Sequence, residues 1–308
     1  MSLADRTREI YDAIPIWGKA IITAGVSIGF YVYYKKATSR PRNTPYKENY
    51  EKDVVYLYQF VRNSATPNFS PYCLKLETWL RIADIPYKNV ENLPFSLKSR
   101  EGTMPFVEVN GVEYVDSSLI IKDLTKLFHK EQLESFLSDE QRAAARAFEH
   151  LAEYSLLWCN VKYKLPHFEQ IIKLCPPNML PAVLKLLYPF FASSMKAATN
   201  QKLLAIGIGR HSDEDIIRIS EDDLSALSNF LGTKHYLTGF KATRVDATVF
   251  AVVANIIYMP FETPQRKLID EKYPNLREYC ERIKHRYWPD WDECTAKFTM
   301  SSDWKKKI

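Results

Sequence analysis

The sequence predicts two domains of different class, an α/β domain followed by an all-helical domain. Up to Phe128, strand patterns alternate with helix patterns, whereas beyond it long helical periodicity prevails and no strand pattern returns. The chain has 308 residues, which is enough for two domains of ordinary size. Its 46% of apolar and 26% of charged residues are typical of a globular protein and exclude a largely disordered one.

The predicted α/β domain covers residues 53–130. Its elements, in chain order, are a strand at 54–60, a helix from Ser70, a strand at 87–90, a hairpin at 106–115 and a helix from Asp116. The first helix has Ser70 as its cap and Pro71 in its first turn, where a missing N–H costs nothing. The hairpin turns at Asn110-Gly111, a strong short turn signal. This order of elements is that of a thioredoxin-like domain.

The predicted helical domain covers residues 137–292. Its expected helices span 138–159, 181–198, 213–231, 246–259 and 273–288. The fourth is preceded by Thr243-Arg244-Val245-Asp246, which matches a capping box with Asp in the usual Glu position. The apolar run Ala247–Met259 is too short to span a bilayer, so we expect a buried core helix there.

The amino-terminal residues 1–36 are expected to form a membrane anchor. The stretch Ile14–Tyr34 contains one charge, Lys19, and reaches the length of about 20 residues that a spanning helix needs. A tryptophan and three tyrosines lie near its two ends, where interfacial aromatic residues are found. An amphipathic surface helix is the alternative, but Ala20–Tyr34 has too little polar face for it.

The charges that flank the anchor predict its orientation. Residues 35–42 carry four basic side chains and no acid, so the positive-inside rule leaves the main body in the cytosol. A short anchor with basic flanks suits the endoplasmic reticulum or the mitochondrial outer membrane. A linker is expected at 37–52 and a basic tail at 293–308. The tail ends in Lys305–Ile308, which either resembles a di-lysine retrieval signal or is simply solvated.

The cysteine and charge patterns exclude two classes of partner. The five cysteines are scattered along the chain, and no pair has the CxxC spacing of a metal or redox site. We therefore expect free thiols in a reducing compartment and no structural metal. The net charge of +5 is mild, and the basic residues do not gather on one periodic face. No nucleic-acid partner is expected.

The predicted architecture and three strings of residues carry a family resemblance. A thioredoxin-like domain followed by an all-helical domain is similar to the glutathione transferase fold. The strings are SPYCLKLETWLRIADIPY (Ser70–Tyr87), GIGRH (Gly207–His211) and YLTGFKATRVDATVF (Tyr236–Phe250). They resemble the failed axon connections family, which includes nematode cadmium-responsive proteins and is related to the metaxins. The resemblance covers residues 53–292 and leaves out the anchor and the tail.

The resemblance implies a thiol site at the turn before the first helix of the α/β domain. Ser70 occupies the position that holds the glutathione thiolate in glutathione transferases, where a hydroxyl can favour the thiolate. The alternative is that Ser70 is only a helix cap. Cys73 is a second candidate catalytic residue, in the first turn of the same helix, but its position also suits a packed thiol. With Ser70 in the first position, redox chemistry would have to be monothiol, through Cys73.

Two further pairs are expected to bind glutathione. Met104-Pro105 resembles the X-cis-Pro element of thioredoxin-like folds, whose backbone can pair with the cysteinyl part of a peptide ligand. Asp116-Ser117 resembles the pair that binds the γ-glutamyl end, with Ser117 toward its carboxylate and Asp116 toward its ammonium. Asp is shorter than the commoner Glu or Gln, and a plain helix cap is the alternative at this position.

Two functions remain open from the sequence. The first is a membrane-anchored, glutathione-binding protein with transferase-like activity and a role in detoxification or stress responses such as the response to metals. The second is a non-catalytic, metaxin-like adaptor on an organelle surface, with other proteins or a second copy of the chain as partners. The insertion Val61–Phe69, which lengthens the loop before Ser70, favours the second.

Overall fold

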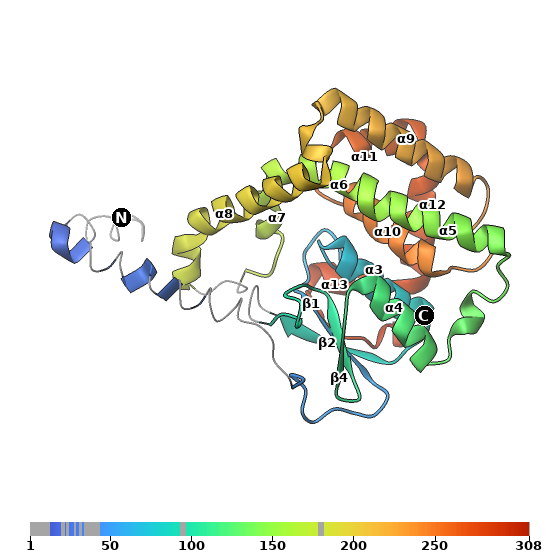
Figure 1. The fold of residues 1–308 in the computed structure, drawn as a ribbon, viewed down its shortest axis with the longest axis horizontal. Coiled ribbons are helices and arrows are strands. Elements are labelled where there is room, and N and C mark those ends of the chain that lie inside the picture. Colours follow the sequence, from blue (N-terminus) through green and yellow to red (C-terminus); the bar gives the residue numbers. More distant parts are fainter. Residues whose placement is uncertain are drawn as a thin grey trace.

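The computed structural model describes residues 13–19, 44–92, 97–177 and 182–307, together with residues 22, 25–27, 29, 30 and 33. Two of its helices, α3 (Pro71–Ile82) and α4 (Ser117–Leu127), separate a small sheet from the main body of helices. Figure 1 shows the sheet on one side of these helices and most of the second domain on the other. The predicted α/β and all-helical domains are thus both present.

The first domain is the predicted thioredoxin-like unit. Its strands are β1 (Val55–Phe60), β2 (Tyr87–Asn92), β3 (Phe106–Val109) and β4 (Val112–Val115), and they form one sheet in the order β2-β1-β3-β4. Strand β1 runs parallel to β2 and antiparallel to β3, and β3 runs antiparallel to β4. The turn between β3 and β4 has positive φ at Asn110 (49°) and Gly111 (79°), as a tight hairpin of this kind requires.

One face of the sheet packs against α3 and α4. The buried apolar side chains at this contact include Val55, Leu57, Val107 and Val109 of the strands and Leu76, Leu80, Ile120 and Leu124 of the helices. The helical residues recur at the spacing of one helix face, which is the pattern that predicted both helices. Because side chains alternate along a strand, Tyr56 and Tyr58 lie on the opposite face of the sheet.

That opposite face contacts residues 44–52, the later part of the segment expected as a linker. The Tyr46 ring lies 5.7 Å from the Tyr58 ring between centroids. The buried Glu108 carboxylate accepts hydrogen bonds from the backbone N–H groups of Tyr46 (2.7 Å) and Lys47 (2.9 Å), and from the Tyr58 hydroxyl (2.7 Å). This stretch is therefore attached to the first domain, and residues 37–43 of the expected linker lie outside the described residues.

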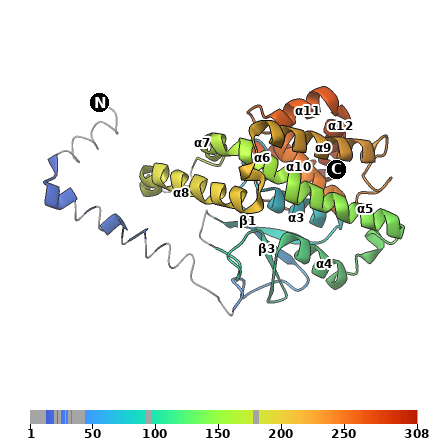
Figure 2. The same ribbon diagram turned by 45° about the horizontal axis from the view of Figure 1, so that its top comes forward.

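The second domain is helical, as predicted. Its helices are α5 (Asp139–His150), α6 (Leu157–Lys164), α7 (Phe168–Lys173), α8 (Ala182–Ile206), α9 (Asp213–Leu231), α10 (Arg244–Ile257), α11 (Pro264–Lys272), α12 (Pro274–Tyr287) and α13 (Trp291–Ala296). A π-helical turn, Leu151–Leu156, joins α5 to α6. Figure 2 shows α5 and α6 continuing one another along the domain, with α3 behind them.

Helix α10 is the core helix that the sequence predicts. Every residue from Val245 to Ile257 is buried. At its start the Asp246 carboxylate accepts hydrogen bonds from the Thr243 N–H (2.7 Å) and hydroxyl (3.1 Å), so the predicted capping box is present. The same carboxylate accepts the N–H of Leu237 at 2.9 Å. Helix α10 packs along α3, which brings the two domains into direct contact.

A buried ionic network, formed by Arg62, Glu77, Arg81 and Asp290, connects the domains. Arg62 Nη1 lies 2.7 Å from Glu77 Oε2, and Arg81 Nη1 lies 2.5 Å from Asp290 Oδ1. The Arg81 guanidinium also lies 3.6 Å from the centre of the Trp288 ring. Burial alone would raise the pKa of Glu77, but the two arginines hold it well below its usual range. The carboxylate therefore stays charged inside the protein.

Part of the segment expected as a basic tail at 293–308 packs against the rest of the protein. Helix α13 crosses the expected domain boundary, and Trp304 is 7% exposed and packs with the core of the first domain. The carbonyl oxygen of Thr299 accepts a hydrogen bond from Arg62 Nε at 3.0 Å, and that of Met300 accepts one from Asn89 at 3.1 Å. These contacts hold residues 297–304 against the first domain.

The expected membrane anchor at residues 1–36 lies largely outside the described residues. Among the residues that the structure does describe, no helix has both the length and the apolar character needed to cross a membrane.

Candidate functional site

The loop before α3 is held by an asparagine. Asn68 Nδ2 donates to the Phe60 carbonyl oxygen at 2.9 Å and to Gln59 Oε1 at 3.3 Å, which attaches the loop to strand β1. Asn68 Oδ1 accepts the Ser70 N–H at 3.0 Å, which fixes the residue that caps α3. The inserted residues 61–69 are thus built into the fold by side-chain hydrogen bonds that the sequence alone did not indicate.

The two candidate catalytic residues sit together on the first turn of α3, but both are enclosed. Ser70 is 9% exposed and makes no side-chain capping bond. Cys73 is completely buried. Burial raises the pKa of the Cys73 thiol to about 12, against opposing hydrogen bonds from the Phe60 backbone and the Ser70 side chain. Cys73 is therefore a protonated, packed thiol at neutral pH, and the geometry favours this reading over a nucleophile.

The Met104-Pro105 bond is cis, as the resemblance implied. Its position follows from the sheet register, in which Tyr58 pairs with Phe106 in antiparallel fashion. Extending that register by two residues places Met104 beside Phe60, the last residue of β1. Met104 is half-buried and packs with the aromatic residues on this face of the sheet. The cis peptide therefore lies next to the end of β1, where the loop that leads to Ser70 begins.

Asp116 caps α4, which is the alternative that the sequence left open. Its Oδ1 accepts the N–H groups of Ser118 (2.9 Å) and Leu119 (3.0 Å). The backbone of Asp116 has φ 65° and ψ 118°, a sparsely populated conformation for a residue with a side chain. Asp116 is exposed and Ser117 is 5% exposed. Oδ2 takes no part in the two capping bonds, so capping occupies only one of the two carboxylate oxygens.

A buried ion pair that the sequence did not predict connects α3 to the start of α4 and to the second domain. Lys75 Nζ lies 2.6 Å from Glu153 Oε1 and 2.7 Å from Ser118 Oγ. Glu153 belongs to the π-helical turn, and π-helical turns occur frequently at functional sites. This contact brings the π-helical turn next to Asp116-Ser117.

Tyr72 and Tyr154 are further residues of this region that motif reasoning missed. Burial raises the pKa of the Tyr72 hydroxyl, and the charges of Glu153, Tyr154 and Asp116 add to the effect, so this phenol lies among those groups. The Tyr154 ring stacks on His150 at 4.9 Å between centroids and is 62% exposed. Tyr72 was predicted only as part of a helix face, and nothing in the spacing indicated Tyr154.

A half-buried lysine, Lys164, lies behind the loop that precedes Ser70. Lys164 Nζ donates to Asn255 Oδ1 at 3.1 Å, and Asn255 Nδ2 donates to the Asn68 carbonyl oxygen at 3.3 Å. Burial lowers the pKa of the Lys164 ammonium to about 7. Both domains therefore supply polar groups around the start of α3.

The geometry brings the predicted pairs to one region without making a complete catalytic centre. Ser70, Met104-Pro105 and Asp116-Ser117 all surround the first turns of α3. All five cysteines are free, as expected, and all are buried. Within the described ranges no group of three or more His, Cys, Asp or Glu side chains could hold a metal ion. The arrangement offers a cis peptide, a hydroxyl and a carboxylate, and it lacks an exposed nucleophile among the predicted residues.

Comparisons with known proteins agree with this architecture. A family model for the glutathione S-transferase N-terminal domain matches residues 71–169, and one for the glutathione S-transferase C-terminal domain matches residues 220–283. Failed axon connections of Drosophila melanogaster is 36% identical over 267 residues, which cover 83% of this chain. Metaxin-2 of Mus musculus is 24% identical over 71% of this chain and 82% of its own length.

These similarities support a metaxin-related family of glutathione-transferase-like proteins for this chain. It spans 63% of the length of the Drosophila relative. The isoprene-epoxide–glutathione S-transferase of Rhodococcus sp. (strain AD45) is 27% identical over 76% of this chain and 99% of the bacterial enzyme.

Solved structures confirm the fold of this chain. Glutathione transferase GSTFuA2 from Phanerochaete chrysosporium has a TM-score of 0.53 and 15% identity, with 77% of this chain and 99% of that chain covered. The glutathione S-transferase CsGST63524 of Ceriporiopsis subvermispora, solved in complex with glutathione, has a TM-score of 0.52 and 14% identity, with coverage of 76% and 97%.

Proposed function

We propose that this protein binds glutathione, or a related small γ-glutamyl thiol, at the start of α3. The observation that carries the proposal is the cis Met104-Pro105 peptide beside the end of β1. In thioredoxin-like folds this element pairs with an extended peptide in the manner of an added strand. The relationship to a bacterial glutathione S-transferase that aligns over 99% of its length supports the same ligand.

The neighbouring groups give the ligand an orientation. Its cysteinyl backbone would lie along Met104, which directs the γ-glutamyl end to Asp116-Ser117 and the sulfur to Ser70. The Asp116 carboxylate suits the ligand's ammonium group, and the Ser117 hydroxyl suits its carboxylate. The Lys75–Glu153 ion pair holds Ser118, and with it the first turn of α4, at this place.

Because Ser70 is buried, binding of the ligand and catalysis on its thiol have to be considered separately. A serine that is only 9% exposed is less available to stabilise a bound thiolate than an open one. We therefore propose binding with slow transferase-like activity. A role in detoxification would follow from such binding. A response to metals such as cadmium would act through the bound thiol, because thiolates are soft ligands that bind soft metal ions.

The same enclosure supports a second candidate, a non-catalytic adaptor that uses the two-domain body to dock other proteins or a second copy of the chain. The inserted loop 61–69 is fixed by Asn68 and contacts the second domain through Asn255. On this reading the thiol site is an inherited feature of the fold, and the binding surface lies elsewhere.

The proposal also includes a membrane tether formed by the amino-terminal segment. The composition of Ile14–Tyr34 favours a membrane tether with the body in the cytosol, at the endoplasmic reticulum or the mitochondrial outer membrane. Ile16 and Trp17 are 87% and 70% exposed, as suits side chains that contact lipid. Removal of residues 1–36 should release the protein to the soluble fraction. Retention in membranes after a carbonate wash would reject the tether.

Isothermal titration calorimetry with glutathione tests the binding proposal. The wild-type protein should bind saturably at submillimolar to millimolar ligand, and Ser117→Ala should weaken binding about tenfold through loss of one charge-assisted hydrogen bond. Ser135→Ala is the matched control, because that serine is exposed and bonds only to a backbone carbonyl of its own turn. Absence of heat from the wild-type protein at millimolar glutathione would reject the proposal in favour of the adaptor.

A further inference from the structure

A cavity of about 340 Å³ lies at the other end of α3, away from the candidate thiol site. It is lined by the C-terminal turns of α3, by α4, by the segment 130–134 and by α5 and the start of α10. Its apolar lining comes from Trp79, Ile82, Ile121 and Leu133. The volume is at the lower end of the range for ligand pockets, which is about 300–1,000 Å³.

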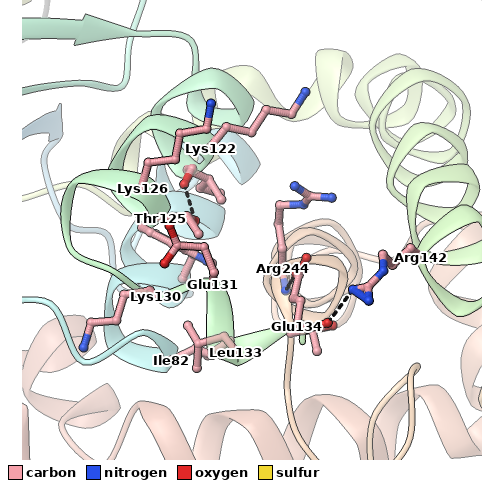
Figure 3. A pocket seen from close by; sticks show the side chains of 13 residues that line it. Ile82, Lys122, Thr125, Lys126, Lys130, Glu131, Leu133, Glu134, Arg142 and Arg244 are labelled. Atoms are coloured by element: carbon pink, nitrogen blue, oxygen red, sulfur yellow. Dashed lines mark hydrogen bonds between the residues drawn. The ribbon is translucent and has the colours of Figure 1, made fainter. Parts of the chain in front are cut away.

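The polar lining of this cavity is strongly basic. It consists of Lys122, Lys126, Lys130, Arg142 and Arg244 on the basic side and of Glu131 and Glu134 on the acidic side, five against two. Figure 3 shows Lys122 and Lys126 extending from α4 on one side of the opening, Arg142 on the other side, and Arg244 between them. Within the described part of the chain, neither Lys122 nor Lys126 has an acidic partner.

One of the two acidic side chains at this cavity already has a fixed partner. Glu134 Oε1 accepts the backbone N–H of Arg244 at 3.0 Å. The Arg244 Nε in turn lies 2.6 Å from the buried Glu149, which sets the direction of its guanidinium. Arg142 Nη1 donates to the Glu134 carbonyl oxygen at 2.7 Å, and Arg142 Nε lies 3.6 Å from the exposed Asp139 carboxylate, so Lys122, Lys126 and Lys130 remain against Glu131. The opening therefore presents more positive charge than the protein itself neutralises.

We propose that this cavity is the docking site for an acidic peptide segment of a partner protein, anchored by one large apolar side chain. Lys122 and Lys126 are one helical turn apart, about 6 Å along α4, and Arg142 stands across the opening on α5. Cations spread over two helices match several carboxylates along a chain better than one anionic head group. The apolar floor has room for a single large side chain of such a segment.

The exposed surface beside the cavity extends the apolar contact. Leu119 is 52% exposed and Leu127 is 40% exposed, and both belong to α4. Leu119, Lys122 and Lys126 recur at a spacing of three and four residues, so they share one face of the helix. An apolar and basic strip on α4 therefore leads into the cavity. This inference does not depend on glutathione binding.

Fluorescence anisotropy with the full-length protein and a labelled peptide Glu-Asp-Glu-Phe-Glu-Asp-Glu tests the proposal. The wild-type protein should bind with an affinity that falls as salt is added, because exposed charges are screened. Lys122→Glu/Lys126→Glu should weaken binding at least about tenfold through like-charge repulsion. Replacing the peptide's phenylalanine by alanine should also weaken it, since that ring would fill the cavity.

The matched control is Lys173→Glu/Lys202→Glu, which changes the net charge equally at two exposed lysines that do not line the cavity. It should bind within about twofold of the wild type. Equal loss in both double variants, or no saturable binding by the wild type, would overturn the proposal. Displacement of the peptide by decanoate at equal concentration would assign the cavity to a small amphipathic anion instead. Lys122→Met/Lys126→Met, which adds no repulsion, keeps the test valid if the glutamate variant fails to fold.

Discussion

The two ends of helix α3 differ in how their contacts are made. At the N-terminal end, the Ser70 N–H donates to the neutral Asn68 side chain, and the Asn68 carbonyl oxygen accepts a hydrogen bond from Asn255 of the second domain. In the C-terminal half, Glu77 and Arg81 form charged contacts, one of which reaches Asp290, 209 positions away. The N-terminal end carries the motif that predicts a ligand site, and the C-terminal half holds the two domains together. One helix thus combines a candidate binding site with a joint between the two domains.

The largest effect is expected at the joint. Glu77→Gln would leave the buried Arg62 and Arg81 without their shared carboxylate, and breaking a buried pair costs about 3–5 kcal/mol. Denaturant unfolding should show this loss of stability. Glu278→Gln, at an exposed position of α12, is the control and should change stability by less than about 0.5 kcal/mol. A small loss in Glu77→Gln would mean that the network is not what joins the domains.

The second prediction concerns Lys164, which lies behind the N-terminal end of α3. Burial lowers its pKa to about 7 in the folded state, whereas the unfolded value is about 10.4. Between these values the unfolded state binds more protons, so this residue makes the free energy of unfolding rise with pH from about 7 to about 10. Below pH 7 the cost of burying the charge is fully present.

Lys164→Met should therefore be more stable than the wild type at about pH 6, and its advantage should shrink as the pH rises toward about 10. Thermal melting across this range measures the difference. Lys202→Met, at an exposed position, should show no such trend. A stability difference that is independent of pH would show that Lys164 is not buried as a charge.

The third prediction separates the two roles of Asp116. Asp116→Ala removes the cap that accepts the Ser118 and Leu119 N–H groups and should cost about 1 kcal/mol. Asp116→Asn keeps the cap, because Asn caps as well as Asp and tolerates positive φ. If Asp116 also binds the ammonium of glutathione, Asp116→Asn should retain stability but lose affinity. Unchanged affinity would leave Asp116 as a cap alone.

The smallest effect is expected at Cys73. Because the thiol is buried and its pKa is raised to about 12, iodoacetamide should not label it in the folded protein at neutral pH. Mass spectrometry before and after unfolding in guanidinium chloride measures the labelling. Rapid labelling of Cys73 in the native protein would contradict the packed thiol and revive a monothiol mechanism.

The difference between local and long-range contacts explains which features the sequence could predict. The strands, the hairpin at Asn110-Gly111 and the core helix α10 follow from local periodicity and turn chemistry, which are visible in a single sequence. The Lys75–Glu153 pair and the packing of Trp304 could not be predicted, because they depend on which distant segments meet. Ser70 does precede the first residue of α3, as predicted, but its burial could not be predicted from local periodicity.

Hydrogen exchange with and without glutathione tests the central claim that one end of α3 is a binding site and the other a structural joint. Bound glutathione should slow exchange in peptides that contain Ser70, Met104 and Asp116-Ser117. Peptides that contain Glu77–Arg81 and Trp288–Asp290 should exchange slowly in both states, without change. Protection confined to the second set, or no protection anywhere at saturating glutathione, would contradict the account.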